Sequence, residues 1–205
     1  EQDMRRMGGL RKYMPITYWT TVIGTLVLVG TPFFSGFYSK DTIIEAAAHN
    51  AHHAGSWVAT YGYWAVLGGV IVTSFYSFRL LYLTFHGKER FDQNPDAHHG
   101  DHHGHDDHHH HHEPHESPWV VTVPLVLLAI PSVVVGFMFI KPMLFGDFFK
   151  DVIFVNADRH PAMAKLAEIF HGPAAMALHG LQTAPFWLAL AGVAASYYMY
   201  LVNPA

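Results

Sequence analysis

Residues 30–36 read Gly30-Thr31-Pro32-Phe33-Phe34-Ser35-Gly36, and they interrupt an apolar run, 16–38, that contains no Asp, Glu, Lys or Arg. Proline removes a backbone donor and clashes with the preceding turn of a helix, and glycine weakens a helix further. The helical pattern resumes after the interruption. The stretch therefore predicts a broken helix over residues 16–50, with Pro32 and Gly36 as its hinge.

Three further uncharged runs are as long as the first one. Residues 56–78, 118–140 and 183–203 also lack charged side chains, and each of the four runs has 21 to 23 residues. A helix of about 20 apolar residues crosses a hydrocarbon core of about 30 Å. The chain is 51% hydrophobic and only 14% charged, whereas soluble domains average about 25% charged residues. We therefore expect an all-α integral membrane protein with about four transmembrane helices in the lipid bilayer, the first of them broken near Pro32–Gly36.

The polar stretches between these runs differ in character. Residues 91–117 form a low-complexity loop with eleven histidines between positions 98 and 115, mixed with Asp and Glu. Neutral imidazoles bind zinc or nickel, but tracts of this composition are more often disordered, solvated loops. Residues 141–182 combine apolar and charged side chains at helical spacing, first over residues 145–152, which predicts short helices lying in the membrane interface.

These boundaries divide the chain into three parts. The first is residues 1–90, in which a basic lead-in precedes the broken helix and a second span. The second is the histidine-rich loop, and the third is residues 118–205. In the first part we expect the broken helix over residues 16–50 and the second span over residues 56–85. In the third part we expect spans over residues 118–140 and 183–203, with the interfacial segment 141–182 between them.

The sequence excludes several kinds of redox chemistry within this stretch. It has no cysteine, which rules out cysteine-ligated iron–sulfur clusters, thiolate zinc sites and disulfides. No glycine-rich nucleotide loop follows a strand pattern. We therefore expect no cofactor and no fixed metal site in this chain, and no nucleic-acid partner. The sequence begins with Glu1 instead of an initiator Met, and its N-terminus shows no signal-peptide pattern. We therefore expect the chain to be an internal piece of a longer protein.

The distribution of positive charge predicts an orientation. The lead-in and the loop after the second span hold seven Lys and Arg residues, whereas the opposite side holds four, or five if Lys40 counts as loop. Loops rich in Lys and Arg remain in the cytoplasm. We therefore expect the lead-in and the histidine-rich loop to be cytoplasmic.

The candidate functional residues follow the break directly, in the sequence Tyr38-Ser39-Lys40-Asp41. An ionisable side chain within a span costs roughly 2.5–3.5 kcal/mol on insertion scales and is a functional hypothesis by default. A lysine removed from water can also release its proton near neutral pH, so Lys40 and Asp41 are candidates for proton translocation. The alternative is that Lys40 only marks the membrane boundary and Asp41 opens a soluble loop. The spacing alone does not separate the two interpretations.

Three titratable residues follow one another on one face of the second helical arm. Asp41, Glu45 and His49 are spaced at i, i+4 and i+8, so they share a face. Such a stripe leads from the break toward the next loop, and it makes Glu45 and His49 candidates for a proton exit path. A solvated helix end explains these two residues equally well.

Several stretches carry a resemblance to a known family. They are Met7-Gly8-Gly9-Leu10-Arg11-Lys12, the run 30–41, the run 73–79, and Phe85-His86-Gly87-Lys88. The chain resembles the subunit L family of bacterial NADH-quinone oxidoreductases (respiratory complex I), whose mitochondrial counterpart is NADH-ubiquinone oxidoreductase chain 5. The resemblance implies that residues 1–90 are the C-terminal end of an antiporter-like core. It also implies that Lys40 belongs to a chain of buried charged groups crossing the membrane arm.

The function implied by this resemblance is that of a proton-translocating membrane subunit. It would couple NADH-to-quinone electron transfer in other subunits to H⁺ pumping through an intramembrane lysine. FMN, iron–sulfur clusters and quinone are then expected in partner subunits, and neighbouring antiporter-like subunits of the membrane arm are expected as partners in a bacterial inner membrane. The alternatives are the large subunit of a multi-subunit Na⁺/H⁺ antiporter, the membrane subunit of a related hydrogenase complex, and a scaffold whose spans only hold the arm together.

Overall fold

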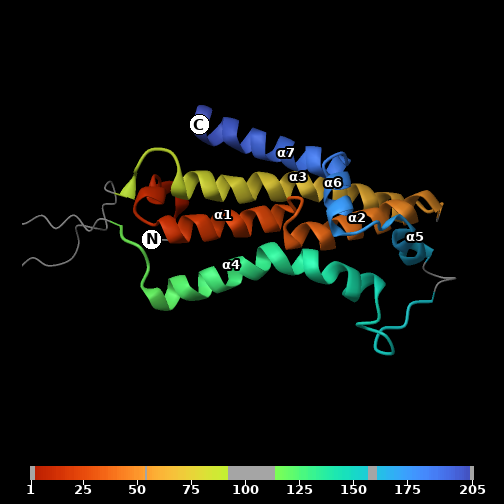
Figure 1. Ribbon diagram of the computed structural model, residues 1–205. Coiled ribbons are helices and arrows are strands. Elements are labelled where there is room, and N and C mark those ends of the chain that lie inside the picture. The colour runs from red at the N-terminus through yellow and green to blue at the C-terminus, as the bar shows by residue number, and fades with distance from the viewer. Residues whose placement is uncertain (1–2, 54, 92–113, 157–160, 204–205) are drawn as a thin grey trace, which may run out of the picture.

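The computed structural model describes residues 3–53, 55–91, 114–156 and 161–203, and the regular elements in these ranges are all helices (Figure 1). This confirms the all-α expectation for the described part of the chain. Short 3₁₀ turns at Met4–Arg6 and Leu10–Lys12 precede α1, and π turns at Lys141–Phe145 and Tyr198–Val202 extend α4 and α7. The main helices are α1 (Pro15–Val29), α2 (Ser35–His53), α3 (Trp57–Phe85), α4 (Trp119–Ile140), α5 (Pro161–Ile169), α6 (Pro173–Gly180) and α7 (Ala184–Tyr197).

Three of these helices are long and apolar enough to cross a membrane. They are α3 with 29 residues, α4 and its extension with 27, and α7 and its extension with 19. The apolar helix α1 has only 15 residues, and α2 continues along the same direction after the break (Figure 1). The fold is therefore a multi-pass membrane bundle, as expected, in which α1 and α2 together form the broken first crossing.

The side chains on the outside of the bundle fit a lipid environment. Trp57, Leu128 and Trp187 are 79%, 66% and 58% exposed, and at most 22% of the most apolar window of each long span is buried inside the chain. Exposed apolar surface of this extent is rare in soluble monomers and marks a membrane or protein interface. The long spans thus present lipid-facing or partner-facing surface.

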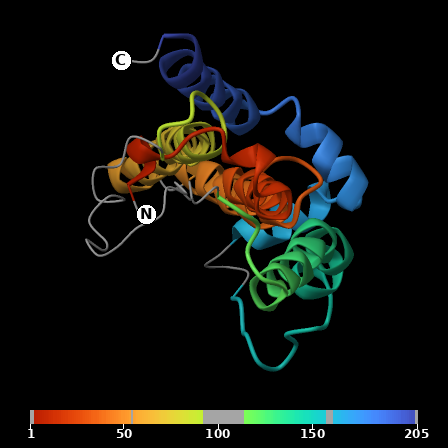
Figure 2. The same ribbon diagram turned by 90° about the vertical axis from the view of Figure 1, so that its left-hand side faces the viewer.

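The broken helix lies in the middle of the bundle. Helix α3 packs against α1, α2 and α7, and α4 packs against α1 and α2. Figure 2, which looks along the helices, shows α4 and α7 on opposite sides of the pair formed by α1 and α3. At the contact of α3 with α7, a methyl group on Gly192 would collide with the Ser74 hydroxyl and lie 2.7 Å from the Ile71 carbonyl oxygen. This glycine therefore allows the two helices to approach closely.

One end of the bundle is built by the lead-in and by the segments that flank the histidine-rich loop. The Gly9 N–H donates to the His86 carbonyl at 3.3 Å, and Lys12 pairs with Glu89 at 3.4 Å. The lead-in and the loop after α3, which the charge distribution assigns to the same side of the membrane, therefore lie together. Residues 92–113 of the predicted loop, and with them most of its histidines, lie outside the described part of the chain.

Glu116, near the C-terminal end of this loop, caps the first turn of α1. Its carboxylate accepts hydrogen bonds from the N–H groups of Ile16 at 2.7 Å and Thr17 at 3.3 Å, and from the Thr17 hydroxyl at 2.6 Å. The first N–H groups of a helix have no partner within it, and a negative charge at this end is favourable. Burial acts to raise the pKa of Glu116, but these bonds and one from Ser117 outweigh it, so the pKa lies below its usual value.

The segment between α4 and α7 differs in part from the prediction. Helices α5 and α6 are short, as expected, but residues 146–156 form turns and extended chain, so the helix predicted over residues 145–152 is wrong. Gly146 takes an extended conformation (φ −112°, ψ −167°) that ends the π turn after α4, and Asp151 takes a left-handed one (φ 66°). Backbone conformations outside the helical region thus interrupt a side-chain pattern that has helical spacing.

Candidate functional site

The break between α1 and α2 is a tight turn whose backbone groups are paired. Gly30 has a left-handed backbone (φ 82°), which glycine adopts without steric cost. The Gly30 N–H donates to the Val27 carbonyl at 3.1 Å. The Thr31 N–H donates to the Leu26 carbonyl at 3.0 Å, and together these bonds form a glycine-ended helix C-terminus. Helix α1 therefore ends through Gly30, two residues before the predicted hinge residue Pro32, which is buried in the turn.

Gly36, the second predicted hinge residue, lies in the first turn of α2 and not in the break itself. A methyl group on it would collide with the Val27 carbonyl oxygen and lie 2.9 Å from the carbonyl carbon, so the glycine permits contact between the two arms. The adjacent Ser35 hydroxyl donates to the Pro131 carbonyl at 3.1 Å and accepts from the Gly136 N–H at 2.8 Å. Pro131 interrupts the hydrogen-bond ladder of α4. The start of α2 is thereby joined to the middle of α4.

Lys40 reaches back from α2 to the C-terminal end of α1. Its ammonium group donates a hydrogen bond to the carbonyl oxygen of Leu28. Its side-chain carbons lie beside Gly30, where an added methyl group would be 3.2 Å from Lys40 Cδ. The last carbonyls of a helix have no partner within it and carry a partial negative charge. The dipole of α1 therefore favours the charged form of Lys40.

Lys40 and Asp41 lie at the level of the middle of the longest span. Both line a small cavity together with Val70 of α3. Val70 is 13 residues from the start of α3 at Trp57 and 15 from its end at Phe85, so about 20 Å separates it from either end at 1.5 Å per residue. This level favours the intramembrane interpretation of Lys40 over the boundary alternative.

The turn of α2 that carries these residues is deeply buried. Asp41 is 5% exposed and Tyr38 is 1% exposed. Phe37 and Tyr38 pack into a hydrophobic cluster with residues of α4 and α6. The cavity beside Lys40 and Asp41 has a volume of about 30 Å³, which is enough for a water molecule. The lysine and the carboxyl group thus share one small enclosure in an apolar surrounding.

Glu45 and His49 occupy successive turns of α2 beyond Asp41. Glu45 is half-buried and interacts electrostatically with Asp41. The His49 ring stacks on that of His53 in the last turns of the helix, with centroids 4.1 Å apart. The structure also places Glu45 and His179 of α6 on the wall of one cavity. The sequence does not reveal this pair, because 134 positions separate the two residues and no spacing rule connects α2 to α6.

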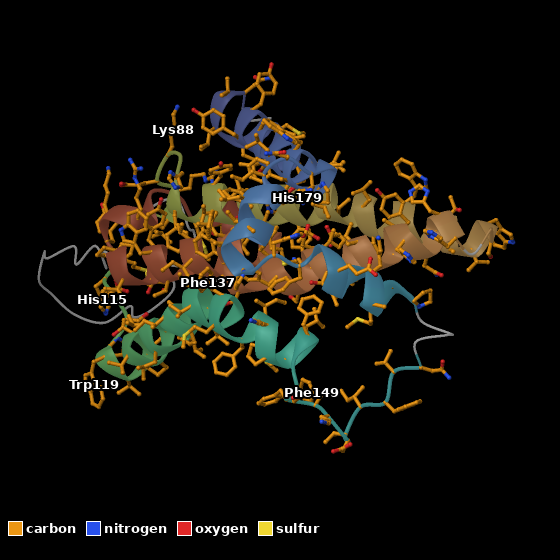
Figure 3. The ribbon with its side chains drawn as sticks, turned by 45° about the vertical axis from the view of Figure 1, so that its right-hand side comes forward. Lys88, His115, Trp119, Phe137, Phe149 and His179 are labelled. Atoms are coloured by element: carbon orange, nitrogen blue, oxygen red, sulfur yellow. The ribbon has the colours of Figure 1, made fainter. Side chains whose placement is uncertain are left out.

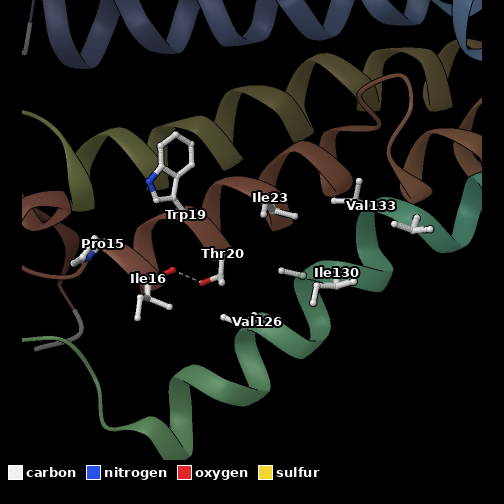
Figure 4. Close-up of a pocket in the computed structure, with 10 residues that line it drawn as sticks. Pro15, Ile16, Trp19, Thr20, Ile23, Val126, Ile130 and Val133 are labelled. Carbon is white, nitrogen blue, oxygen red and sulfur yellow. Dashed lines mark hydrogen bonds between the residues drawn. The ribbon is translucent and has the colours of Figure 1, made fainter.

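A wider groove between α1 and α4 has a different character. Its volume is about 580 Å³, and Figure 4 shows Trp19 and Ile23 of α1 on one wall and Ile130 of α4 on the other. The Thr20 hydroxyl in this groove donates to the Ile16 carbonyl of its own helix at 3.0 Å. None of the residues that line the groove carries a charge. The groove therefore suits hydrocarbon and not a path for protons.

Comparison with known proteins gives consistent results. Residues 1–68 match the family described as NADH:quinone oxidoreductase/Mrp antiporter, TM. The whole chain is 53% identical, over 206 residues, to NADH-quinone oxidoreductase subunit L of Neisseria meningitidis serogroup A, and the match covers 30% of that protein. It is 36% identical to NADH-ubiquinone oxidoreductase chain 5 of Cryptococcus neoformans var. grubii, again over the whole chain and 27% of the relative.

A third relative is NAD(P)H-quinone oxidoreductase chain 5 of Picosynechococcus sp. It is 44% identical over an alignment of 147 positions, which covers 67% of the chain and 20% of the relative. The chain thus spans about 30% of the length of the curated relatives that it matches over its full extent.

Proposed function

The chain belongs to the family of NADH-quinone oxidoreductase subunit L and its chain 5 counterparts, and from this premise we propose that it translocates protons as part of such a complex. Electron transfer from NADH to quinone takes place in other subunits and drives the translocation. The names of the relatives support this family over the antiporter and hydrogenase alternatives. The observation that carries the proposal is the Lys40 ammonium, which is bonded to the end of a broken helix at mid-span depth.

The proton is carried by the Lys40 nitrogen. The Leu28 carbonyl and the dipole of α1 stabilise the ammonium form. When that contact is lost, burial in a medium of low dielectric constant favours the neutral amine, and the proton is released. Because Gly36 keeps the two arms in direct contact, a small displacement of α1 against α2 is enough to change the environment of Lys40.

The released proton passes to Asp41 through the shared cavity and then along α2. Asp41 and Glu45 are one helical turn apart, which corresponds to about 6 Å along the axis, and they interact electrostatically. His49 lies one further turn toward the end of α2. These residues form the exit path that we propose on this helix.

The rest of the complex supplies what this chain lacks. We place FMN, the iron–sulfur clusters and quinone in partner subunits, and we take other membrane-arm subunits, especially antiporter-like neighbours, as the direct partners. The complex lies in the bacterial inner membrane. The lead-in and the histidine-rich loop face the cytoplasm, because this side holds seven of the twelve Lys and Arg residues. Protons then leave toward the opposite end, where α2 ends.

The test uses the whole complex in proteoliposomes with two substitutions at one position. Lys40→Met removes the titratable group, whereas Lys40→Arg keeps a positive charge that cannot be deprotonated in a protein. We expect both variants to lower the proton-to-electron ratio, which is measured as acidification per NADH oxidised. A scaffold role predicts an unchanged ratio in both variants, and that result would overturn the proposal.

A further inference from the structure

A cavity beyond Asp41 extends the polar region away from α2. It has a volume of about 380 Å³ and is lined by residues of α2, α5, α6 and the turn between α5 and α6, and by the π turn after α4. Its polar and titratable wall residues are Thr42, Glu45, His171 and His179, and the other lining residues are apolar. A space of this size holds several water molecules. It can therefore contain a chain of waters that joins Glu45 to the two histidines.

The helix and the cavity place these groups in order. Asp41 and Glu45 lie one turn apart on α2, and Glu45 and His179 line the same cavity. Figure 3 shows His179 on α6, where this short helix crosses the bundle, and the contacts of α6 with α2 agree with this placement. His179 is also exposed, so its ring reaches both the cavity and the outside of the chain. His49, in contrast, is stacked on His53.

Helix α6 is fixed to the turn of α2 that carries Lys40. The Phe37 ring approaches Gly180 so closely that a methyl group there would collide with it. The Tyr38 hydroxyl donates to the Pro173 carbonyl at 3.4 Å, and Ala177 between these two contacts is completely buried. His179 is therefore held in register with the break, since both ends of its helix contact the residues just before Lys40.

We propose that His179 relays protons from Glu45 to the end of the bundle at which α2 ends, a role that rests on the proposed translocation through Lys40. The protonated Glu45 gives its proton, through cavity water, to one ring nitrogen of neutral His179. This step leaves a carboxylate and an imidazolium. The imidazolium releases the proton on its other ring nitrogen to water on the side of His171, which restores the neutral ring. Imidazole suits this role because it gains and loses a proton near neutral pH.

The test compares substitutions of two histidines in the complete complex in proteoliposomes. His179→Gln and His179→Ala remove the relay, and His52→Gln is the matched control, because His52 is exposed in the last turns of α2. We expect both His179 variants to lower the proton-to-electron ratio below the unsubstituted value, because the path along α2 through His49 remains, and His52→Gln to keep the unsubstituted value. Added imidazole should restore the ratio in His179→Ala, because a free base can occupy the vacated space. Subunit content is checked on native gels.

Each other result has a definite meaning. An unchanged ratio in both His179 variants, with a lowered ratio in Lys40→Met, overturns the relay and leaves translocation through Lys40 in place. A lowered ratio that imidazole does not restore, in a complex with all its subunits, assigns His179 a packing role and also overturns the relay. If Lys40→Met itself pumps normally, the proposed function fails and the relay fails with it.

Discussion

Replacing Gly36 with alanine tests whether contact between the two arms of the broken helix positions Lys40. The added methyl group would collide with the Val27 carbonyl oxygen and lie 2.9 Å from the carbonyl carbon. Carbon atoms in contact are about 3.5–4.0 Å apart, so the end of α1 must move away from α2 by roughly 1 Å. Overpacking of this kind costs about 1–3 kcal/mol.

The same displacement moves the hydrogen-bond acceptor of Lys40. Leu28 follows Val27 in the last turn of α1 and supplies the carbonyl that binds the ammonium, and hydrogen bonds weaken steeply when their geometry is distorted. We expect Gly36→Ala to lower both the midpoint of thermal denaturation of the purified complex and the proton-to-electron ratio in proteoliposomes. The first quantity reports the strain, and the second reports the loss of the Lys40 contact.

Gly24→Ala on α1 is the matched control. An added methyl group at Gly24 meets no atom within 4 Å, and alanine favours a helix over glycine by about 1 kcal/mol. This variant should keep the ratio of the unsubstituted complex, and its thermal midpoint should be equal or slightly higher. If Gly36→Ala behaved like Gly24→Ala in both measurements, the reasoning that connects the packing of the break to Lys40 would be refuted.

Two further predictions concern other parts of the fold. Glu116→Gln should lower the stability of the complex at pH 7 by about 1 kcal/mol, because the charged cap of α1 is lost. Since the pKa of Glu116 is lowered in the folded state, the stabilisation is fully present above the unfolded pKa and is lost as the pH falls through the folded pKa. Thermal denaturation should therefore separate the variant from the unsubstituted complex at pH 7 and not at strongly acidic pH, and an equal difference at both would contradict the cap. Gly192→Ala should push α7 away from Ser74 of α3 and lower the free energy of unfolding by about 1–3 kcal/mol. We expect faster limited proteolysis of the C-terminal segment, and an unchanged rate would contradict this prediction.

The broken membrane helix is predictable because its causes are local. Pro32 and the neighbouring glycines interrupt an uncharged run, and the run is long enough to predict a membrane span. The order of Lys40 and Asp41 after the break also follows from the sequence. The residue that ends α1, however, is Gly30, whose left-handed conformation (φ 82°) depends on the return of the chain against the last turn of the helix.

The contacts that define the site are not predictable, because they join segments that are distant in sequence. Ser35 bonds to Gly136 across 101 positions, and Glu45 and His179, 134 positions apart, line one cavity. Helical spacing predicts which residues share a face of one helix, but it carries no information about which helix covers that face. The same limitation explains the wrong helix over residues 145–152, where apolar spacing is present and the backbone at Gly146 and Asp151 is not helical.

The central claim is that a lysine near the bilayer midplane is held by the end of a broken helix. It is tested most directly by a density map of the assembled complex in a lipid nanodisc, at a resolution that shows side chains. We expect the Lys40 nitrogen to lie within hydrogen-bond distance of the Leu28 carbonyl oxygen, at the level of Val70, near the centre of the bilayer. A nitrogen in bulk water or among the lipid headgroups would contradict it.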